Sequence, residues 1–280
     1  MREISSQLIS DAVRGLLIEA NYVIGPDVEA RMRSCMAAEP SPEGRDVMRQ
    51  LLENYEIART ERVAICQDTG MAVVFLDVGQ DVHIEGDLGE AVSDGVRRAY
   101  RDGYLRKSVV RDPLYDRANT GDNTPPILHT RIVPGDRIDI LVSPKGFGSE
   151  NMSQIRMLVP ADGEEGVVRF VTEAIEKAGP NPCPPVIVGV GIGGTMEMAA
   201  ILAKRMTARP LDEPNPDPRY AALERRILDE INKSGVGPAG IGGRTTALSV
   251  NIATYPTHIA SMPVAVNVCC HAARHAHAVL

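Results

Sequence analysis

The sequence contains no tryptophan and few aromatic residues of any kind. Phenylalanine occurs three times and tyrosine seven times, so aromatic residues make up 4% of the 280 residues. Hydrophobic residues nevertheless account for 44% of the chain, which is enough to form a substantial core. Because aromatic rings bury the most area per residue, a core that lacks them must rest on valine, isoleucine, leucine, methionine and alanine.

The chain also lacks an excess of basic charge. It carries 30 lysines and arginines against 37 aspartates and glutamates, a formal net charge of −7. Binding to nucleic acid depends on contacts between basic side chains and phosphates, so this balance argues against nucleic acid as the main partner. An acidic protein that takes an anionic substrate must instead concentrate a few arginines at its site.

Long apolar runs are missing as well. No stretch approaches the ~18 consecutive apolar residues that would indicate a membrane span. The opening residues, MREISSQLIS, lack the basic and then apolar pattern of a secretory signal. We therefore expect a cytoplasmic protein that does not associate with a membrane.

The five cysteines do not indicate a disulfide framework, because their number is odd and their spacing wide. We expect Cys35, on a predicted helix, to be a small buried apolar residue. Cys66, Cys183 and Cys270 instead fall at junctions between predicted elements, where a scaffold positions functional loops. Prolines on both sides of Cys183 restrict the backbone and hold its thiolate in one orientation. From the residues alone, three unrelated core thiols are an equally good interpretation.

Apolar periodicity predicts a mixed α/β (α+β) fold. The first sixty residues contain three predicted helices, the third beginning near Ser41 and Pro42. After them, the β-rich runs MAVVFLDVG, RIDILVSP and PPVIVGVGIGG alternate with the helical segments at 88–105 and 166–179. We expect a helical N-terminal region, residues 1–60, followed by a mixed α/β body, residues 61–280, in which RPLDEPNPDP is a surface loop.

Two glycine-rich stretches resemble each other. Gly191–Thr195 reads GIGGT and Gly240–Thr246 begins GIGGRT, and both could be turns that present N–H groups to an anion. Gly189, Gly191 and Gly194 also form a G-x-G-x-x-G pattern after a strand and before a helix. The acidic residue that a dinucleotide site needs lies in a proline-rich loop, so we interpret this stretch as a turn and not as an NAD site.

The remaining candidates have a structural and a functional interpretation each. His271 and His275, four apart in HAARH, are predicted to share one face of a helix and would suit zinc, although no paired C-x₂-C spacing accompanies them. Arg106 is either a solvated arginine or an anion ligand. His258, in TYPTHIASMP, is either a satisfied core histidine or a catalytic acid/base.

Taken together, CQDTG, LRKSVVRDP, KGFGSEN, NPCPP, the two GIGG turns, YPTH and the terminal CH resemble the α part of class I, iron–sulfur fumarate hydratases and L-tartrate dehydratases. The similarity extends from about Met1 to the last residues, with the order of the motifs preserved. This agreement of several separate motifs makes the resemblance specific.

The resemblance implies a [4Fe–4S] cluster held by Cys66, Cys183 and Cys270. Three thiolates leave one iron without a protein ligand, and that iron can polarise the hydroxyl of a 2-hydroxy dicarboxylate. By position within the matching motifs, the substrate site would contain Gln67, Arg106 and Gly148, with Arg106 pairing a carboxylate. Asp68 and His258 would be the acid/base or orienting groups. Cys269 departs from the pattern, but the CH pairing favours Cys270 as the ligand.

The resemblance also implies a partner. In the family a β part closes the pocket. A chain that stops soon after Cys270, the third of the cysteines implied to bind the cluster, resembles the separate α subunit. We therefore expect a hydro-lyase that acts with a β subunit, in an α2β2-type assembly, on a small dicarboxylate. Fumarate and (S)-malate are the first expectation for the substrate, L-tartrate is the alternative, and a zinc-stabilised binding module is the alternative from a different class.

Overall fold

The computed structural model describes residues 2–280, and within them the chain forms two compact units. Of these residues, unit 1 comprises 2–24, 55–147 and 274–280, and unit 2 comprises 25–54 and 148–273. Both units contain helices and sheets, so the mixed α/β expectation is confirmed. The predicted division into a helical region, residues 1–60, and a mixed α/β body, residues 61–280, is based on secondary structure. The two compact units do not test that division, and it stays a prediction.

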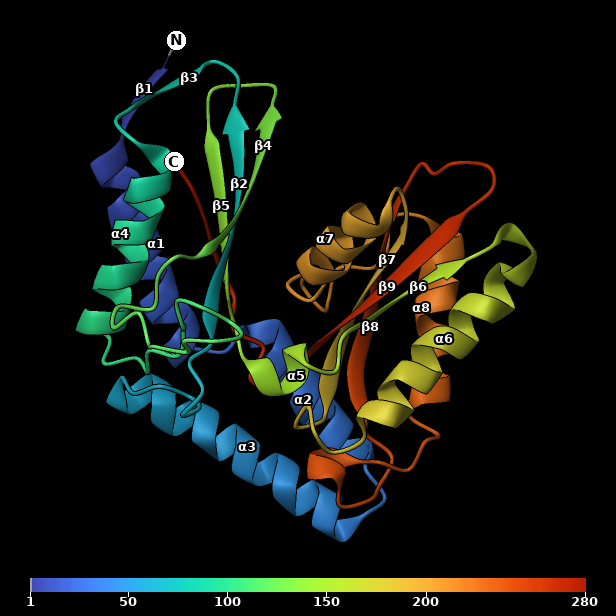
Figure 1. Ribbon diagram of the computed structural model, residues 1–280. Helices are drawn as coiled ribbons and strands as arrows, with labels where there is room; N and C mark the ends of the chain where they lie inside the picture. The colour runs from blue at the N-terminus through green and yellow to red at the C-terminus, as the bar shows by residue number, and fades with distance from the viewer. Residues whose placement is uncertain (1) are drawn as a thin grey trace. The chain divides into compact units, whose positions relative to one another are not determined.

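Unit 1 contains a four-stranded sheet covered by two helices (Figure 1). Its elements are β1 (Arg2–Ser5), α1 (Ser6–Tyr22), β2 (Met71–Gly79), β3 (Val82–Glu85), α4 (Leu88–Asp102), β4 (Ile127–Val133), β5 (Ile138–Lys145) and β10 (Ala276–Val279). The strand order is β10-β5-β2-β4, in which β2 pairs parallel with β4 and antiparallel with β5. β1 and β3 form a separate parallel pair.

The core of unit 1 follows from helical and strand periodicity. Apolar residues three or four apart on α1 and α4 face alternate residues of β2 and β5, as the period of 3.6 and the period of 2 require. The fully buried members include Ile9, Val13, Leu17, Val92, Val96, Val74, Leu76, Ile138, Ile140 and Val142. Tyr100 is the largest of them, and the core is otherwise mostly aliphatic, as the scarcity of aromatic residues predicts.

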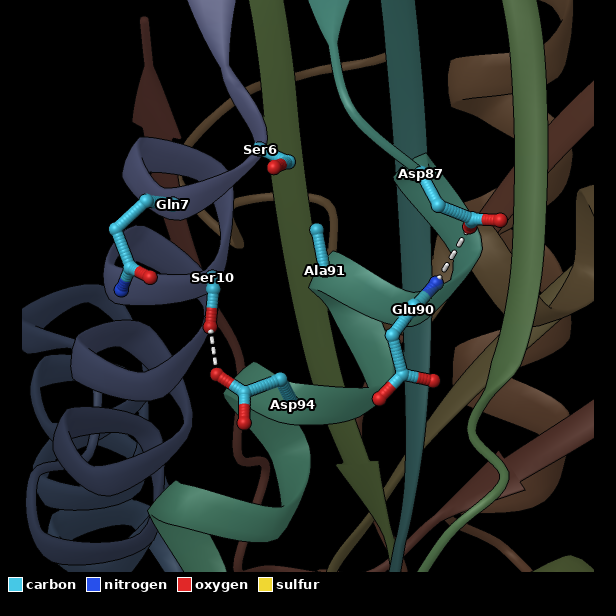
Figure 2. Close-up of a pocket in the computed structure, with 7 residues that line it drawn as sticks. All are labelled: Ser6, Gln7, Ser10, Asp87, Glu90, Ala91 and Asp94. Atoms are coloured by element: carbon cyan, nitrogen blue, oxygen red, sulfur yellow. Dashed lines mark hydrogen bonds between the residues drawn. The ribbon is translucent and has the colours of Figure 1, made fainter.

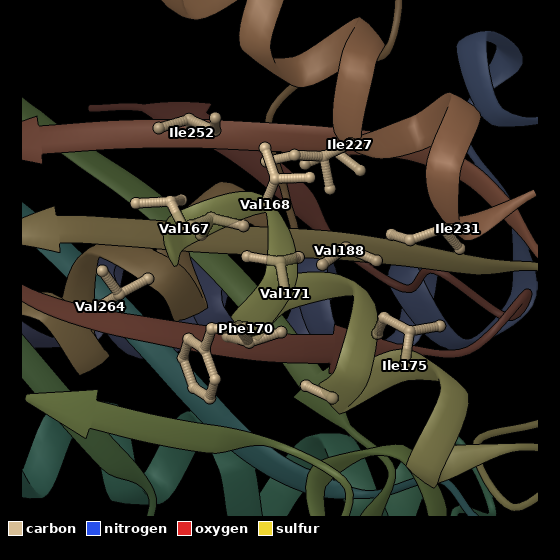
Figure 3. Packing of buried hydrophobic residues seen from close by; sticks show 14 of the residues in the cluster. Val167, Val168, Phe170, Val171, Ile175, Val188, Ile227, Ile231, Ile252 and Val264 are labelled. Atoms are coloured by element: carbon tan, nitrogen blue, oxygen red, sulfur yellow. The ribbon is translucent and has the colours of Figure 1, made fainter. Parts of the chain in front are cut away.

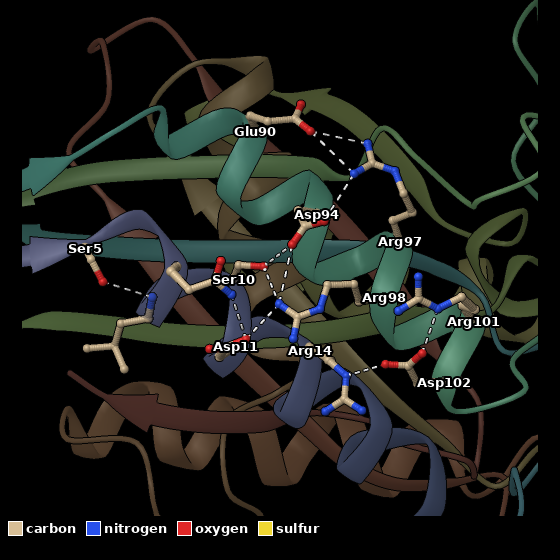
Figure 4. Close-up of polar contacts among 12 residues, drawn as sticks. Ser5, Ser10, Asp11, Arg14, Glu90, Asp94, Arg97, Arg98, Arg101 and Asp102 are labelled. Carbon is tan, nitrogen blue, oxygen red and sulfur yellow. Dashed lines mark hydrogen bonds and ion pairs between the residues drawn. The ribbon is translucent and has the colours of Figure 1, made fainter.

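Polar contacts join the solvent sides of α1 and α4 (Figure 4). Arg98 pairs with Asp11 at 2.7 Å, and Ser10 donates to Asp94 at 2.7 Å. Arg101 and Arg14 both bind Asp102, and their guanidinium groups hold the pKa of that carboxyl at about 2. Exposed ion pairs contribute little to stability, so the buried face supplies most of the stability of this helix pair.

Unit 2 is a three-layer arrangement around a second four-stranded sheet. Its elements are α2 (Pro26–Ala38), β6 (Gln154–Leu158), η1 (Pro160–Asp162), α6 (Gly163–Ala178), β7 (Val186–Gly193), α7 (Met196–Met206), α8 (Pro218–Ile231), η2 (Pro238–Gly240), β8 (Ala247–Tyr255) and β9 (Met262–Cys269). Two further helices, α3 (Pro42–Glu61) and α5 (Phe147–Glu150), include the residues where the chain changes unit. The strand order is β6-β9-β7-β8, with β7 parallel to β8 and antiparallel to β9.

Two helices cover one face of this sheet. Side chains of α6 and α8, among them Phe170, Val171 and Ile227, pack on alternate residues of β7, β8 and β9 (Figure 3). On the other face α7 lies close against β7, and it buries Ala199 and Ala203 against Ala265 of β9. Small residues on both elements permit this close approach.

The glycines of the G-x-G-x-x-G pattern explain how α7 comes so close. A Cβ added to Gly189 would lie 2.0 Å from the carbonyl oxygen of Ala203, and one added to Gly191 would lie 2.0 Å from that of Ala199. Neither position can hold a side chain while α7 keeps its place. Gly189 and Gly191 therefore serve helix–strand packing.

The predicted helices and strands agree with the structure over most of their lengths. MAVVFLDVG is β2 from its first residue to its last, and the third helix begins at Pro42, where Ser41 Oγ accepts from the Gly44 amide at 3.0 Å. The helix predicted for HAARH is wrong. β9 ends at Cys269, an irregular segment follows, and residues 276–279 pair antiparallel with β5, so His271 and His275 share no helix face.

No helix among residues 2–280 is both long and apolar enough to cross a membrane.

Candidate functional site

In unit 1 the predicted site residues cluster in the loop before β2. Cys66 and Asp68 are half-buried there, and Gln67 is exposed. Asp68 Oδ1 accepts from the Gly70 amide at 3.1 Å, and Oδ2 accepts from the Phe147 amide at 3.0 Å. The carboxylate therefore ties the CQDTG loop to the end of β5, where the KGFG sequence begins, and its orientation is fixed by two main-chain donors.

Arg274 holds the same loop from its main-chain side. It is 3% exposed, and its Nη1 donates both to the carbonyl oxygen of Asp68 and, at 3.3 Å, to Oδ1 of the buried Asn21. A Cβ on Gly146 would lie 2.9 Å from Arg274 Nη2 and 3.2 Å from Asp68 Oδ2, so a side chain there would displace one of these two groups. A buried charge that donates to a loop carbonyl is a costly arrangement, which indicates that the loop must be held in place.

Arg274 was not predicted from the sequence. Its only signal is its position four residues after Cys270. An isolated arginine at the end of a chain is usually interpreted as solvated.

A third set of contacts holds the end of the loop. Gly70 has a φ of +76°, and its hypothetical Cβ would meet the main chain of Lys145 at 2.6 Å. Tyr100 donates to the carbonyl oxygens of Thr69 and Gly70 at 2.9 and 2.8 Å, and Asn123 Nδ2 donates to that of Gly70 at 3.1 Å. Burial raises the pKa of Tyr100 well above its usual value, so the hydroxyl stays a donor.

Arg106 lies beside Gln67 in the same unit. Its Nη1 donates to Gln67 Oε1 at 2.5 Å, and its carbonyl oxygen accepts from Thr69 Oγ1 at 2.9 Å. The side chains of Gln67 and Arg106 are both exposed, so the remaining guanidinium donors are open to solvent. Unit 1 thus brings Gln67, Asp68 and Arg106 together as predicted neighbours of Cys66.

In unit 2, two of the predicted cysteines belong to adjoining turns. Cys183 is exposed and has a φ of +53°, a conformation that residues other than glycine rarely adopt. The amide of His271 donates to the carbonyl oxygen of Cys183 at 3.4 Å, and this places the residue after Cys270 against the Cys183 turn. Cys270 is half-buried, with its Sγ 3.8 Å from the carbonyl oxygen of Ala272.

The other two cysteines have different surroundings. Cys269 is 7% exposed and lies within β9 opposite Ile187. It is therefore less accessible to solvent than its neighbour Cys270, which is half-buried. Cys35 lies on α2 as predicted, but it is half-buried and not fully buried, and this partial burial raises the pKa of its thiol. No disulfide joins any of the five.

His258 and Gly148 also belong to unit 2. His258 lies in an exposed turn after β8, and its Nδ1 accepts from the Ala260 amide at 3.2 Å. The interpretation of His258 as a core histidine is therefore wrong. Gly148 is the second residue of α5, and a Cβ there would meet only the carbonyl oxygen of Asn181, at an ordinary 3.5 Å. Within residues 2–280, no group of three or more Cys, His, Asp and Glu side chains could hold a metal ion.

One hollow elsewhere in unit 1 is not a better candidate. It has a volume of about 250 Å³ and lies at the first turns of α1 and α4, where Ser6, Gln7, Ser10, Asp87, Glu90, Ala91 and Asp94 line it (Figure 2). Two of its carboxylates already accept hydrogen bonds within the protein, Asp94 from Ser10 and Asp87 from the Glu90 amide at the helix start. It contains no residue predicted for the site.

Comparison with known proteins gives one consistent result. A family model described as fumarate hydratase (Fumerase) matches residues 10–279. A protein of Methanocaldococcus jannaschii, provisionally named L(+)-tartrate dehydratase subunit alpha, is 39% identical over 273 residues, which are 96% of each chain. The L(+)-tartrate dehydratase alpha subunits of Escherichia coli K12 and Shigella sonnei are 34% identical over 252 residues, 89% of this chain and 82% of theirs.

Proposed function

The chain belongs to the fumarate hydratase (Fumerase) family, and from that premise we propose that it is the α subunit of an L(+)-tartrate dehydratase. The observation that carries the proposal is the relative from Methanocaldococcus jannaschii, whose name specifies this substrate and which matches over 96% of both chains. Fumarate and (S)-malate were the first expectation from the sequence, and the names of the relatives favour the alternative instead. Membership of a hydro-lyase family displaces the zinc-stabilised module.

The proposed reaction removes water from adjacent carbons. The C–O bond of one hydroxyl breaks, a C–H proton leaves the neighbouring carbon, and the resulting enol becomes a 2-oxo dicarboxylate. Malate lacks the second hydroxyl, so the same elimination gives an alkene. The chemistry needs an electrophile at the departing hydroxyl, a base near the C–H bond, and cationic groups for the two carboxylates.

We propose that Cys66, Cys183 and Cys270 hold a [4Fe–4S] cluster. The donor set suits the group, because thiolates are the ordinary ligands of iron–sulfur clusters and all three cysteines lie in turns where a sulfur is half-buried or exposed. Cys269 suits it less, since the strand buries it. When bound, a cluster with three thiolate ligands supplies an iron with one open position for substrate oxygen.

The protein's own groups supply the remaining chemistry. Arg106 offers solvent-facing donors for a substrate carboxylate, and its bond to Gln67 orients the guanidinium plane. Asp68 keeps lone pairs beyond the two main-chain bonds, so it is the group that can accept a proton. His258 Nδ1 accepts from the Ala260 amide, which leaves Nε2 as the ring nitrogen that can donate to a substrate. We therefore assign the base to Asp68 and the proton donor to His258.

The partner follows from the same comparison. The relatives are named as alpha subunits, and we propose that a separate β subunit completes the site in an α2β2-type assembly. A fraction of the substrate contacts would then come from the partner. The isolated chain is expected to bind iron with little or no turnover.

The test is anaerobic reconstitution of the chain together with its β subunit. We expect about four irons per α chain and a kcat/KM for L-tartrate at least a hundredfold above that for (S)-malate or fumarate. Alanine at Cys66, Cys183 or Cys270 should abolish iron binding, whereas Cys35→Ala and Cys269→Ala should retain it. Preference for malate would assign the chain to fumarate hydratase, and a protein without iron or activity would overturn both assignments.

A further inference from the structure

The anion that occupies the second glycine-rich turn is a side chain of the protein itself. Glu39 follows α2 directly and is 1% exposed. Its Oε1 accepts from the amides of Arg244 and Ser41 at 2.9 and 3.1 Å, and its Oε2 accepts from the amide of Thr245 at 2.7 Å. The sequence predicted that GIGGRT would present N–H groups to an anion, and this carboxylate takes that place.

The main chain of Glu39 is fixed as well. Its carbonyl oxygen accepts from Arg45 Nη1 at 2.8 Å, so the carboxylate is anchored on the α2–α3 connection before it reaches the loop. A Cβ on Gly243, which has a φ of +121°, would lie 2.7 Å from Glu39 Oε1. The loop therefore fits closely around a charge supplied from some 205 residues away along the chain.

The loop whose amides bind Glu39 also contacts the turn that contains Cys183. We define the glycine-rich loop as Gly235–Thr246. The amide of Ala239 donates to the carbonyl oxygen of Pro184 at 2.8 Å, and a Cβ on Gly240 would lie 2.3 Å from the Cβ of Pro180. The loop thus contacts the Cys183 turn on both sides of the cysteine.

The Cys183 turn needs such support. A φ of +53° is costly for a residue with a side chain, and it persists only where neighbours determine it. Within the turn, one main-chain bond, from the Cys183 amide to the carbonyl oxygen of Pro180 at 3.0 Å, holds this conformation. Further constraints come from the glycine-rich loop and from the His271 amide.

We propose that Glu39 is a positioning residue for Cys183, and that its buried carboxylate fixes the thiol through the glycine-rich loop and the Pro180–Pro185 turn. The importance of that position rests on the proposed function, in which Cys183 is a cluster ligand. The path itself depends only on contacts within unit 2. Loss of the carboxylate releases the amides of Arg244 and Thr245, loosens the loop, and lets Cys183 relax from its left-handed backbone conformation.

The test compares Glu39→Gln with the wild type in two measurements. In the metal-free full chain, hydrogen–deuterium exchange followed by mass spectrometry should accelerate at least tenfold in residues 236–246 and at the three amides of residues 180–186, those of Asn181, Cys183 and Val186. Exchange in strand β2 of unit 1 should stay within twofold of the wild type. In the reconstituted protein with its β subunit, the rate of iron loss to a chelator should rise by a similar factor.

Matched variants separate positioning from general destabilisation. Glu176→Gln, an exposed glutamate on α6 of the same unit, should change neither measurement. Glu39→Asp keeps the charge and should recover part of the protection. Gly240→Ala disturbs the contact with Pro180 and leaves Glu39 in place, so it should accelerate exchange at 180–186 even where Glu39→Gln does not fold.

The outcomes are distinguishable from those of the proposed function. Accelerated exchange at 180–186 without iron binding in the wild type would support the positioning of Cys183 and overturn the cluster. A uniform rise in exchange across both units, or no change at 180–186 in Glu39→Gln and Gly240→Ala, would overturn the proposal itself.

Discussion

Arg274 donates a hydrogen bond to the main-chain carbonyl oxygen of Asp68, which lies 206 residues earlier in the chain. The bond joins a loop that precedes a strand to a segment near the end of the sequence, and both belong to unit 1. Because the guanidinium is buried, this bond gives a partner both to a donor of Arg274 and to the carbonyl oxygen of Asp68.

Replacing Arg274 by methionine should therefore destabilise the protein. The change leaves the carbonyl oxygen of Asp68 and the amide oxygen of Asn21 without their charged donor, and buried acceptors left unsatisfied cost about 1–3 kcal/mol each. We expect a loss of about 2–4 kcal/mol in urea unfolding, with Arg274→Lys intermediate. Arg226→Met, which removes exposed pairs with Glu164 and Glu165, should leave the unfolding free energy nearly unchanged. Equal stability of the Arg274→Met protein and the wild type would contradict the assignment.

Glu39 should make stability depend on pH in the acid range. Burial alone would raise the pKa of its carboxyl, but hydrogen bonds from Arg244, Thr245 and Ser41 outweigh burial and lower it below the ordinary 4.5. A pKa that is lower in the folded state contributes stability above the unfolded value and loses it as pH falls through the folded value.

The measurement is urea unfolding of the wild type and Glu39→Gln between pH 7 and pH 3. The difference in unfolding free energy between them should be constant above about pH 5 and should shrink steadily below 4.5, the ordinary value for this carboxyl. Glu176→Gln should follow the wild type throughout. A gap that stays constant down to pH 3 would show that the pKa of Glu39 is the same in the folded and the unfolded protein.

Two Gly→Ala changes, one at the contact between α7 and β7 and one on the exposed side of α1, should have opposite effects on the stability of the protein. At Gly191 the new Cβ would lie 2.0 Å from the carbonyl oxygen of Ala199, so Gly191→Ala should cost about 3 kcal/mol or more through overpacking. At Gly15, exposed on α1, nothing lies within 4 Å, and Gly15→Ala should stabilise the protein by about 0.5–1 kcal/mol. Thermal unfolding of both variants checks the pair. A Gly191→Ala protein with an unchanged melting temperature would mean that α7 can move away.

Arg106→Lys tests the carboxylate contact of the proposed site. Lysine keeps the charge but cannot make the bidentate contact, so kcat/KM of the reconstituted enzyme should fall about 10- to 100-fold, with most of the change in KM. Arg117→Lys is the matched control, because Arg117 lies in the same surface segment and donates to the carbonyl oxygen of Pro113. Equal losses in both variants would remove Arg106 from the substrate site.

Local patterns predicted the longer elements well, and for a physical reason. α2 and β2 begin and end where proline, glycine and the change of periodicity place them. β9 was not predicted, although the alternation of Val264, Val266 and Val268 is the signal that identifies it, and all three lie in the core of unit 2. Short strands such as β1 and β10 exist through pairing with distant partners, which local propensity does not encode.

The candidate site was predicted to a similar degree. Motifs selected Gln67, Asp68 and Arg106, and unit 1 places them on one loop system. Arg274 and Glu39 were not predicted, because each acts across more than two hundred residues on a main-chain group. Nearly every residue has the same main-chain donor and acceptor, so no residue type in the sequence marks the partner of such a contact. The contacts can be identified only in the folded structure.

The segmented make-up of unit 1 has a consequence for synthesis. Its sheet includes β10, and Leu280 exchanges hydrogen bonds with Ile138 in both directions, at 2.8 and 3.1 Å. A ribosome therefore delivers all of unit 2 before the last strand of unit 1 and the guanidinium that holds the Asp68 loop. The two units reverse the usual vectorial order, in which the N-terminal part is finished first. The nascent chain therefore lacks the bond from Arg274 to the CQDTG loop until residue 274 has been translated.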